Sequence, residues 1–216
     1  MTRLVIFDLD GTLCNTTRAM SLCGNWALEE LGFQGFEQSA YGGFSGGGID
    51  EYVNAILEAA GDREHRYAER FWHLYLKRQS ELREEANIPY DGIKQLLKSL
   101  KKRGVRLALL SNKDHETCVE IAETVFGVGV FDAVRGDQRA IPVKPDPAGV
   151  FALLDQLCVP SEDTLYIGDT EVDMKTGKNA GLRTVAALWG YRSRETLAAY
   201  SPYAMIETPS QLLDLL

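Results

Sequence analysis

The second half of the chain repeats one pattern, in which segments of helical periodicity alternate with short, mostly apolar runs. In residues 91–103, four apolar side chains fall on one helical face, and the run 105–110 follows after a single glycine. Strands that alternate with helices in this way form parallel sheets, because each helix carries the chain back across the sheet to start the next strand. The pattern therefore predicts an α/β fold with a parallel sheet.

The same periodicities predict the other elements of this sheet. Strands are expected at residues 4–7, 105–110, 130–134, 164–167, 184–188 and 203–206. Helices are expected at residues 91–103, 117–126, 146–157 and 210–216. The connections between them are short, as in a compact domain.

Residues 15–88 interrupt the pattern. They have helical periodicity in the stretches 19–31, 49–60 and 63–85, and they contain no run typical of a strand. Proline at position 89 disfavours helix in the preceding residue, which marks the return to the α/β pattern. We therefore expect two domains, a core formed by residues 1–14 and 89–216 and an inserted helical domain of residues 15–88.

Two carboxylates, Asp8 and Asp10, stand two positions apart directly after the apolar run 4–7. Alternate residues of a strand point to opposite faces, so these two side chains are expected on one side of the chain where it leaves the sheet. Like charges so close resist joint ionisation unless a cation compensates them. The pair therefore indicates a site for a cation.

Other polar residues follow the predicted strands at the same edge of the sheet, where open parallel sheets bind their ligands. They are the segments Ser111-Asn112-Lys113 and Gly168-Asp169-Thr170, with Asp173 one helical turn later and Lys144 in a loop that can reach the edge. Mg²⁺ prefers a few carboxylate and carbonyl oxygens together with water and substrate phosphate. We therefore expect Mg²⁺ as cofactor, with Asp8, Asp10, Asp169 and Asp173 as the metal-binding residues.

This arrangement of charges suggests phosphoryl transfer. Asp8 is placed to attack phosphorus and to form an aspartyl phosphate. Asp10 can protonate the leaving oxygen and then accept a proton from the attacking water. Ser111 and Lys144 can hold the phosphoryl oxygens as their charge redistributes. The predicted catalytic residues are thus Asp8, Asp10, Ser111 and Lys144.

These residues also resemble a known family. The segments Asp8-Leu9-Asp10-Gly11-Thr12, Ser111-Asn112, Lys144 and Gly168-Asp169-x-x-x-Asp173 are similar, in order and spacing, to the four motifs of haloacid-dehalogenase-type phosphohydrolases. The resemblance implies a three-layer, Rossmann-like core with an inserted α-helical cap. It also implies Mg²⁺ bound by Asp8, the Asp10 carbonyl and Asp169, with Asp173 acting through water or Lys144.

The resemblance narrows the substrate to a small phosphomonoester. Segments 43–48 and 185–191 are most similar to the phosphoglycolate phosphatases of the family, so phosphoglycolate is the first candidate. Nucleotides, sugar phosphates and pyrophosphate are the alternatives. The glycines of segment 43–48 precede a predicted helix and can expose N–H groups to an anion, although a flexible loop is an equal reading. The expected substrate-binding residues are Thr12, Thr16, Gly46, Gly47, Gly48 and Asn112.

Related activities are disfavoured by single residues. True dehalogenases of the family lack an acid at the position of Asp10. Sugar-phosphate mutases carry a histidine where this chain has Met20, and phosphonate-cleaving relatives need a lysine that residues 14–62 do not contain. A receiver-like signalling module is a different class, but Asp10 argues against it because a signalling module should keep its phosphate.

Composition limits the partners. Lys and Arg number 23 against 31 Asp and Glu, a net charge of −8, which argues against nucleic-acid and anionic-membrane partners. The four cysteines form no C-x-x-C pair, and neither a signal peptide nor a spanning apolar run is evident, so a cytoplasmic protein is expected. The expected partner is a small phosphorylated metabolite, and the expected oligomeric state is a monomer or homodimer.

The aromatic residues Trp72 and Tyr75 lie in the predicted helix 63–85 and are interpreted as residues that pack this helix against its neighbours.

Overall fold

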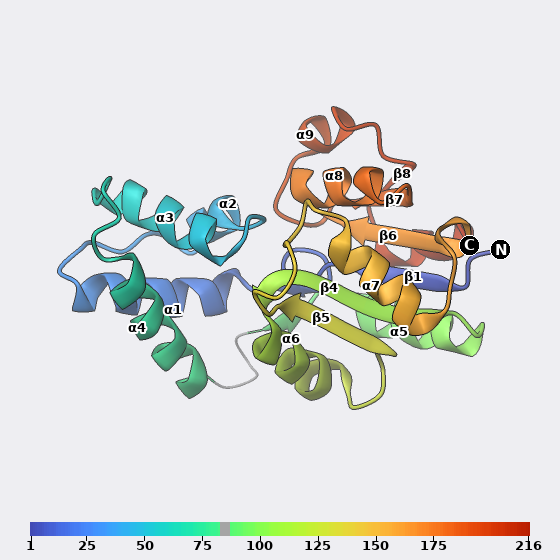
Figure 1. Ribbon diagram of the computed structural model, residues 1–216, viewed down its shortest axis with the longest axis horizontal. Helices are drawn as coiled ribbons and strands as arrows, with labels where there is room; N and C mark the ends of the chain where they lie inside the picture. Colours follow the sequence, from blue (N-terminus) through green and yellow to red (C-terminus); the bar gives the residue numbers. More distant parts are fainter. Residues whose placement is uncertain (83–86) are drawn as a thin grey trace.

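The computed structural model describes residues 1–82 and 87–216, which form an α/β core and a cluster of four helices beside it (Figure 1). The core strands are β1 (Leu4–Phe7), β4 (Arg106–Asp114), β5 (Ala133–Asp137), β6 (Thr164–Gly168), β7 (Arg183–Ala187) and β8 (Ala204–Ile206). The core helices are α5 (Ile93–Lys102), α6 (His115–Ile121), the π-helix η2 (Ala122–Phe126), α7 (Ala148–Leu157), the 3₁₀ turn η3 (Ser161–Asp163), α8 (Glu171–Asn179), α9 (Arg194–Ala198) and the 3₁₀ helix η4 (Pro209–Asp214).

The six core strands form one parallel sheet in the order β5-β4-β1-β6-β7-β8. Strand β1 is central, and its last residue, Phe7, is level with Leu109 of β4 and Ile167 of β6. The carboxyl ends of these three strands therefore lie side by side. The predicted α/β fold with a three-layer, Rossmann-like core is confirmed.

Alternating side chains of β1 divide the core into two apolar layers. Val5 and Phe7 pack with residues of α5, α6 and η4, whereas Leu4 and Ile6 pack with α7 on the other face. Helices α8 and α9 extend the second layer over β7. A fully buried Leu, Ile or Phe side chain stabilises a fold by about 1.5–3 kcal/mol, so these layers fix the sheet that carries the site.

The four remaining helices, called the helical cluster below, are α1 (Thr17–Glu30), α2 (Ala40–Phe44), α3 (Ile49–Ala60) and α4 (Ala68–Glu81). They share an apolar core of their own, which includes Leu28, Tyr41, Ile56 and Phe71. Figure 1 shows the helical cluster on one side of the molecule, beside the sheet and the core helices that cover it. The division of the chain into domains at residues 14/15 and 88/89 stays a prediction.

Short strands that the sequence did not predict lie at both of these positions. Strand β2 (Cys14–Asn15) pairs antiparallel with β3 (Ile88–Pro89). Two-residue strands carry no periodicity, which is why the sequence contained no sign of them. Helix α2 was also unexpected, because its five residues are too few for an apolar repeat.

Several predicted boundaries were wrong. Strand β4 continues through polar residues to Asp114, because backbone pairing with β5 resumes at Asp114 and Asp137 after a shift in register. That pairing also places β5 at 133–137 and not at 130–134. Helix α6 begins two residues before the predicted helix 117–126, because Asp114 caps it and accepts the Thr117 N–H at 3.0 Å.

Two further helices differ from the sequence-based expectation. Helix α4 begins at Ala68 and not at position 63, because the Asp62 carboxylate accepts the Tyr67 N–H and holds a turn between them. The predicted end of this helix, in residues 83–85, lies outside the described residues. The closing helix is a 3₁₀ helix, η4. None of the helices in residues 1–82 and 87–216 combines the length and apolar character needed to cross a bilayer.

Candidate active site

A tight turn after β1 presents Asp8 and Asp10. The Asp8 N–H donates to the Ile167 carbonyl at 2.9 Å and extends the β1–β6 pairing by one residue. The chain then folds back so that the N–H groups of Leu13 and Cys14 both donate to the Leu9 carbonyl at 3.0 Å. Gly11 has a φ of +88°, and a Cβ there would lie 2.2 Å from Asp169. Glycine is therefore required both by the turn and by the carboxylate beside it.

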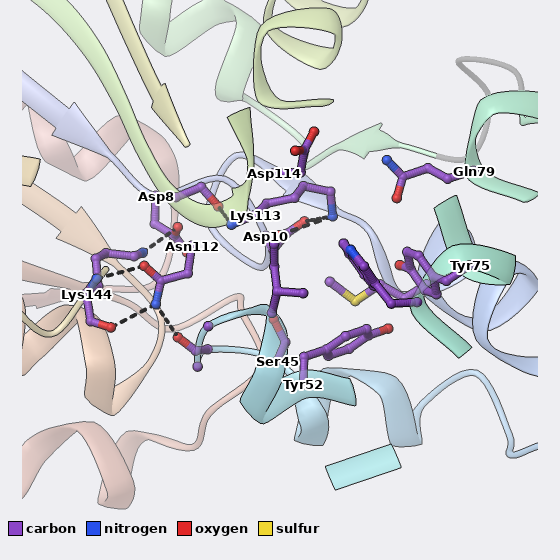
Figure 2. A pocket seen from close by; sticks show the side chains of 17 residues that line it. Asp8, Asp10, Ser45, Tyr52, Tyr75, Gln79, Asn112, Lys113, Asp114 and Lys144 are labelled. Carbon is purple, nitrogen blue, oxygen red and sulfur yellow. Dashed lines mark hydrogen bonds and ion pairs between the residues drawn. The ribbon is translucent and has the colours of Figure 1, made fainter. Parts of the chain in front are cut away.

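Lys144 joins two of the predicted site carboxylates. Its Nζ lies 2.7 Å from Asp8 Oδ1 and 2.7 Å from Asp173 Oδ1 (the Asp8 contact is drawn in Figure 2). Only 4% of the lysine side chain is exposed. Burial lowers the pKa of Lys144, but Asp173 and Asp8 outweigh it and raise that pKa well above its usual value. The lysine is therefore a permanent cation at neutral pH.

Asp173 is held by its own helix as well as by Lys144. Thr170 caps α8, and its N–H and hydroxyl donate to Asp173 Oδ2 at 3.0 and 2.6 Å. The Tyr166 hydroxyl donates to Oδ1 at 2.9 Å. Burial raises the pKa of Asp173, but Lys144 and these hydrogen bonds outweigh it, so the net pKa is lowered. Asp173 is thus an ionised, fixed carboxylate.

Asp169 is positioned by residues from distant segments. Its Oδ1 accepts the Thr12 hydroxyl at 2.8 Å, and its Oδ2 accepts the Tyr191 N–H at 2.8 Å. A Cβ at Gly190 would lie 2.3 Å from the Asp169 side chain. Trp189 fixes the same segment by donating its indole N–H to the Thr12 carbonyl at 3.0 Å. The segment 189–191 therefore forms a close-fitting wall around one carboxylate.

Three carboxylates converge closely enough to bind one metal ion. Asp8, Asp169 and Asp173 each offer an oxygen within 4.8 Å of the others, and all three are buried. Burial raises the pKa of Asp169 to about 7 and that of Asp8 well above its usual range, and neighbouring carboxylates add to both shifts. A dication removes this repulsion, and the all-oxygen donor set fits Mg²⁺. The ligand role predicted for the Asp10 carbonyl stays a prediction.

The Asp10 carboxylate pairs with a second lysine. Lys113 Nζ lies 3.2 and 3.3 Å from its two oxygens, and both side chains are nearly buried. Burial lowers the pKa of Lys113, but Asp10 outweighs it and raises that pKa above its usual value. The site thus contains two lysine ammonium groups, Lys144 and Lys113, each of which lies next to a carboxylate.

Asn112 connects the site to the helical cluster. Its amide exchanges two hydrogen bonds with the Lys144 backbone, at 2.9 and 2.8 Å, and also donates to the Gly46 carbonyl at 3.2 Å (Figure 2). Ser111 precedes it in β4, and the Ser111 hydroxyl accepts the backbone N–H of Lys113 at 3.1 Å. The side chain of Asn112 is thus committed to backbone groups that position Lys144 and the glycine loop.

Arg192 makes a second connection to the same loop. Its guanidinium donates to the carbonyls of Gly42 and Ser45, each at 2.8 Å, and pairs with Glu171 at 2.8 Å. Burial raises the pKa of Glu171, but the hydrogen bonds and charge of Arg192 outweigh it and lower that pKa. Arg192 therefore holds the loop before α3 against the core.

A cavity lies between the core and the helical cluster. Its core side carries Asp8, Asp10, Ser111, Asn112, Lys113, Asp114 and Lys144. The helical cluster contributes Met20, Ile49, Tyr52, Trp72, Tyr75 and Gln79, and the loop before α3 contributes residues 45–48. Figure 2 shows Asp10 and Lys113 between the Asp8–Lys144 pair and the two tyrosines. The cavity thus has a charged side and an aromatic side.

Most of the predicted site residues meet here, with two exceptions. The four catalytic candidates, Asn112 and the glycines 46–48 line the cavity, and Asp169 and Asp173 are buried in the core within reach of Asp8. Thr12 and Thr16 do not line it. The Thr12 hydroxyl donates to Asp169, and the Thr16 hydroxyl lies 2.9 Å from the Tyr191 hydroxyl. Their role as substrate contacts stays a prediction.

Several residues that line the cavity were not assigned to the site from the sequence. The interpretation of Trp72 and Tyr75 as helix packing is confirmed, because both belong to the apolar core of the helical cluster and their ring centroids lie 5.1 Å apart. Both side chains also line the cavity, which the sequence did not indicate. Lys113 was given no role. Its position directly after Ser111-Asn112, at a strand end, was the only sign of its importance.

Comparison with known proteins shows matches over nearly the whole chain. Residues 5–187 match the family model of the haloacid dehalogenase-like hydrolases. A phosphoglycolate phosphatase of Aquifex aeolicus is 31% identical over 99% of this chain and 96% of that protein. Another, from Cereibacter sphaeroides, is 35% identical over 87% of this chain and 86% of that protein. A crystal structure from Lactobacillus delbrueckii subsp. bulgaricus has a TM-score of 0.91, with 28% identity over 100% of this chain and 98% of that chain.

Proposed function

Since the chain belongs to the haloacid dehalogenase-like hydrolase family and is a phosphatase, we propose that it hydrolyses a small phosphomonoester. The proposed reaction depends on Mg²⁺ and proceeds through an aspartyl phosphate on Asp8. One observation carries the proposal. Asp8 lies at the cavity with Lys144 at 2.7 Å, and two more buried carboxylates lie within 4.8 Å of it. A carboxylate that faces a cavity, with an ammonium group beside it and two carboxylates that could share a cation with it, is a nucleophile suited to an anionic phosphoryl group.

In the first half-reaction an Asp8 oxygen forms a bond to phosphorus while the bond from phosphorus to the leaving oxygen breaks. Asp10 lines the same cavity and, in its protonated form, donates a proton to that oxygen, so the product leaves with a neutral hydroxyl group. In the second half-reaction Asp10 accepts a proton from water, whose oxygen attacks phosphorus. The aspartyl bond then breaks, phosphate is released and the Asp8 carboxylate is restored.

The remaining residues of the site hold charge. Lys144 and Ser111 both line the cavity, and in this proposal the ammonium group and the hydroxyl bind phosphoryl oxygens in both half-reactions. Asp8, Asp169 and Asp173 would hold Mg²⁺, with the Asp10 carbonyl as a further ligand. The ion, when bound, neutralises the charge of the phosphoryl group and of the carboxylates around it. The helical cluster acts as a cap that excludes bulk water from the aspartyl phosphate.

Phosphoglycolate is the first candidate substrate. Curated relatives with 31% and 35% identity carry the name phosphoglycolate phosphatase, and they match this chain in both its core and its helical cluster. Nucleotides, sugar phosphates and pyrophosphate are the alternatives, because the core motifs contact only the phosphoryl group. The expected partner is accordingly a small phosphorylated metabolite.

The test is release of phosphate from p-nitrophenyl phosphate with and without Mg²⁺, by the wild type and by Asp8→Asn and Asp10→Asn. We expect Mg²⁺-dependent release by the wild type, no labelling of Asp8→Asn by phosphate, and a trapped phosphoprotein in Asp10→Asn. Absence of metal-dependent release by the wild type would refute the proposal. A panel of phosphoglycolate, sugar phosphates, nucleotides and pyrophosphate then identifies the substrate class.

A further inference from the structure

Lys113 is a cation of the cavity to which the reaction above gives no task. It lies at the end of β4, and only 13% of its side chain is exposed. Among the described residues, Asp10 is its one hydrogen-bond partner through Nζ, at 3.2 and 3.3 Å. A buried ammonium group with a single partner calls for an explanation, because removing its charge from water is costly.

The ammonium group retains hydrogen-bonding capacity. Lysine has three N–H donors and no acceptor. The two contacts to Asp10 use at most two of these donors, which leaves at least one for a ligand in the cavity that Lys113 lines. The other lysine of the cavity, Lys144, donates to both Asp8 and Asp173, and the proposed reaction assigns its remaining donor to the phosphoryl group. Lys113 is therefore the better placed of the two to bind a second group on the substrate.

The position of Lys113 indicates which part of the substrate it meets. Asp10 donates its proton to the leaving oxygen in the proposed reaction, so its direct neighbour Lys113 lies on the side of the leaving group. Figure 2 shows Lys113 between the Asp8–Lys144 pair and the tyrosines of the helical cluster. A group attached one or two bonds beyond the leaving oxygen would therefore meet this ammonium group.

The opposite wall of the cavity carries no charge. The helical cluster contributes Met20, Ile49, Tyr52, Trp72, Tyr75 and Gln79. The core side holds one further carboxylate, that of Asp114. Its Oδ1 is engaged in capping α6, where it accepts hydrogen bonds from the N–H and the hydroxyl of Thr117 at 3.0 and 3.1 Å.

We propose that Lys113 is a specificity-determining residue, which selects phosphomonoesters whose leaving group carries an anionic substituent and binds that substituent directly. The inference rests on the proposed phosphatase function and deepens it. A carboxylate two bonds from the leaving oxygen, as in phosphoglycolate, fits this description. A charge-assisted hydrogen bond in a buried site favours such substrates over uncharged ones by about 10- to 100-fold in kcat/KM.

The experiment compares two substrates of the same chain length, phosphoglycolate and ethyl phosphate, which lacks the carboxylate. Lys113→Met and Lys113→Gln are measured beside the wild type, and Lys178→Met, an exposed lysine on α8, is the matched control. Circular dichroism melting shows which variants fold, and the glutamine variant keeps a donor if methionine is not tolerated. The quantity of interest is the ratio of the two kcat/KM values, since any effect on Asp10 that both substrates share cancels in it.

The expected result is that the ratio falls by about 10- to 100-fold in the Lys113 variants, mainly through KM for phosphoglycolate, and stays unchanged in Lys178→Met. An equal loss of activity toward both substrates would overturn the inference and leave the phosphatase function standing. If the wild type with Mg²⁺ released phosphate from neither ester nor from p-nitrophenyl phosphate, the proposed function itself would fail, and this inference with it.

Discussion

Replacement of Lys144 by methionine tests whether the site carboxylates are held together by charge compensation. The Lys144 ammonium lies 2.7 Å from both Asp8 and Asp173, and the three side chains are 4%, 7% and 0% exposed. Methionine has a similar length and fills much of the same space, so the change removes the charge and leaves most of the packing. Two buried carboxylates then face each other, with Asp169 close to both.

The cost follows from the burial of these groups. Removing one partner of a buried ion pair destabilises a protein by about 3–5 kcal/mol, because the remaining charge stays buried without compensation. For a chain of 216 residues, each kcal/mol lowers the melting temperature by about 2–4 °C, so a decrease of about 6–20 °C is expected without metal. Below neutral pH the loss is smaller, because a proton on a carboxylate replaces the missing ammonium charge.

The sign of this pH dependence can be derived by proton linkage. The folded variant retains protons that the unfolded chain has already released, so its stability falls as the pH rises. Thermal melts of the wild type, Lys144→Met and the surface control Lys178→Met, at pH 5 and pH 8 with EDTA or with Mg²⁺, measure the effect. A deficit equal to that of Lys178→Met, or a deficit identical at the two pH values, would show that charge compensation is not the reason for Lys144.

Three further predictions concern other parts of the site. Arg192→Met removes the hydrogen bonds to the Gly42 and Ser45 carbonyls, so the loop before α3 becomes less ordered and kcat/KM should fall about tenfold. The control is Arg194→Met, which breaks only the exposed pair with Glu207. It should change kcat/KM by less than about twofold in the same steady-state assay. Because burial raises the pKa of Asp169 from its ordinary value of 3.8 to about 7, the metal-free protein should lose up to about 4 kcal/mol of stability as the pH rises from 4 to 7. Mg²⁺ or Asp169→Asn should reduce that loss in melts; an unchanged slope in the asparagine variant would assign it to another group. Gly11→Ala should lower the free energy of unfolding, measured in urea, by more than about 1 kcal/mol, because the position has a φ of +88° and the new Cβ would lie 2.2 Å from Asp169. The same variant should bind Mg²⁺ more weakly in calorimetry. No change in either measurement would contradict the close fit described above.

The order of the core elements was predictable because apolar periodicity reflects burial on one helical face or within a sheet. Strands β1, β6 and β7 therefore lie within one residue of their expected positions. Strand β4 was predicted too short, because its last residues pair through the backbone while their side chains are polar. Polar side chains at a strand end carry no periodic signal, and only the neighbouring strand decides how far the pairing continues.

The candidate site was predictable to the same degree and for a related reason. Residues that follow parallel strands meet at one edge of the sheet whatever the rest of the chain does, so Asp8, Ser111 and Asp169 could be brought together from the sequence. Residues that reach the cavity from the helical cluster, such as Tyr52 and Trp72, could not, because helical periodicity shows which face is apolar and not what that face meets.

The sequence alone therefore determined the fold class, the edge of the sheet at which the chemistry lies, and the residue types available there. The tertiary structure decided which charges pair. Asp10 meets Lys113 across 103 positions of the chain, Asp8 meets Lys144 across 136, and Arg192 reaches the Gly42 carbonyl across 150. Local patterns in a sequence extend over a few turns of helix or one strand. Contacts between such distant residues depend instead on how complete elements pack against one another.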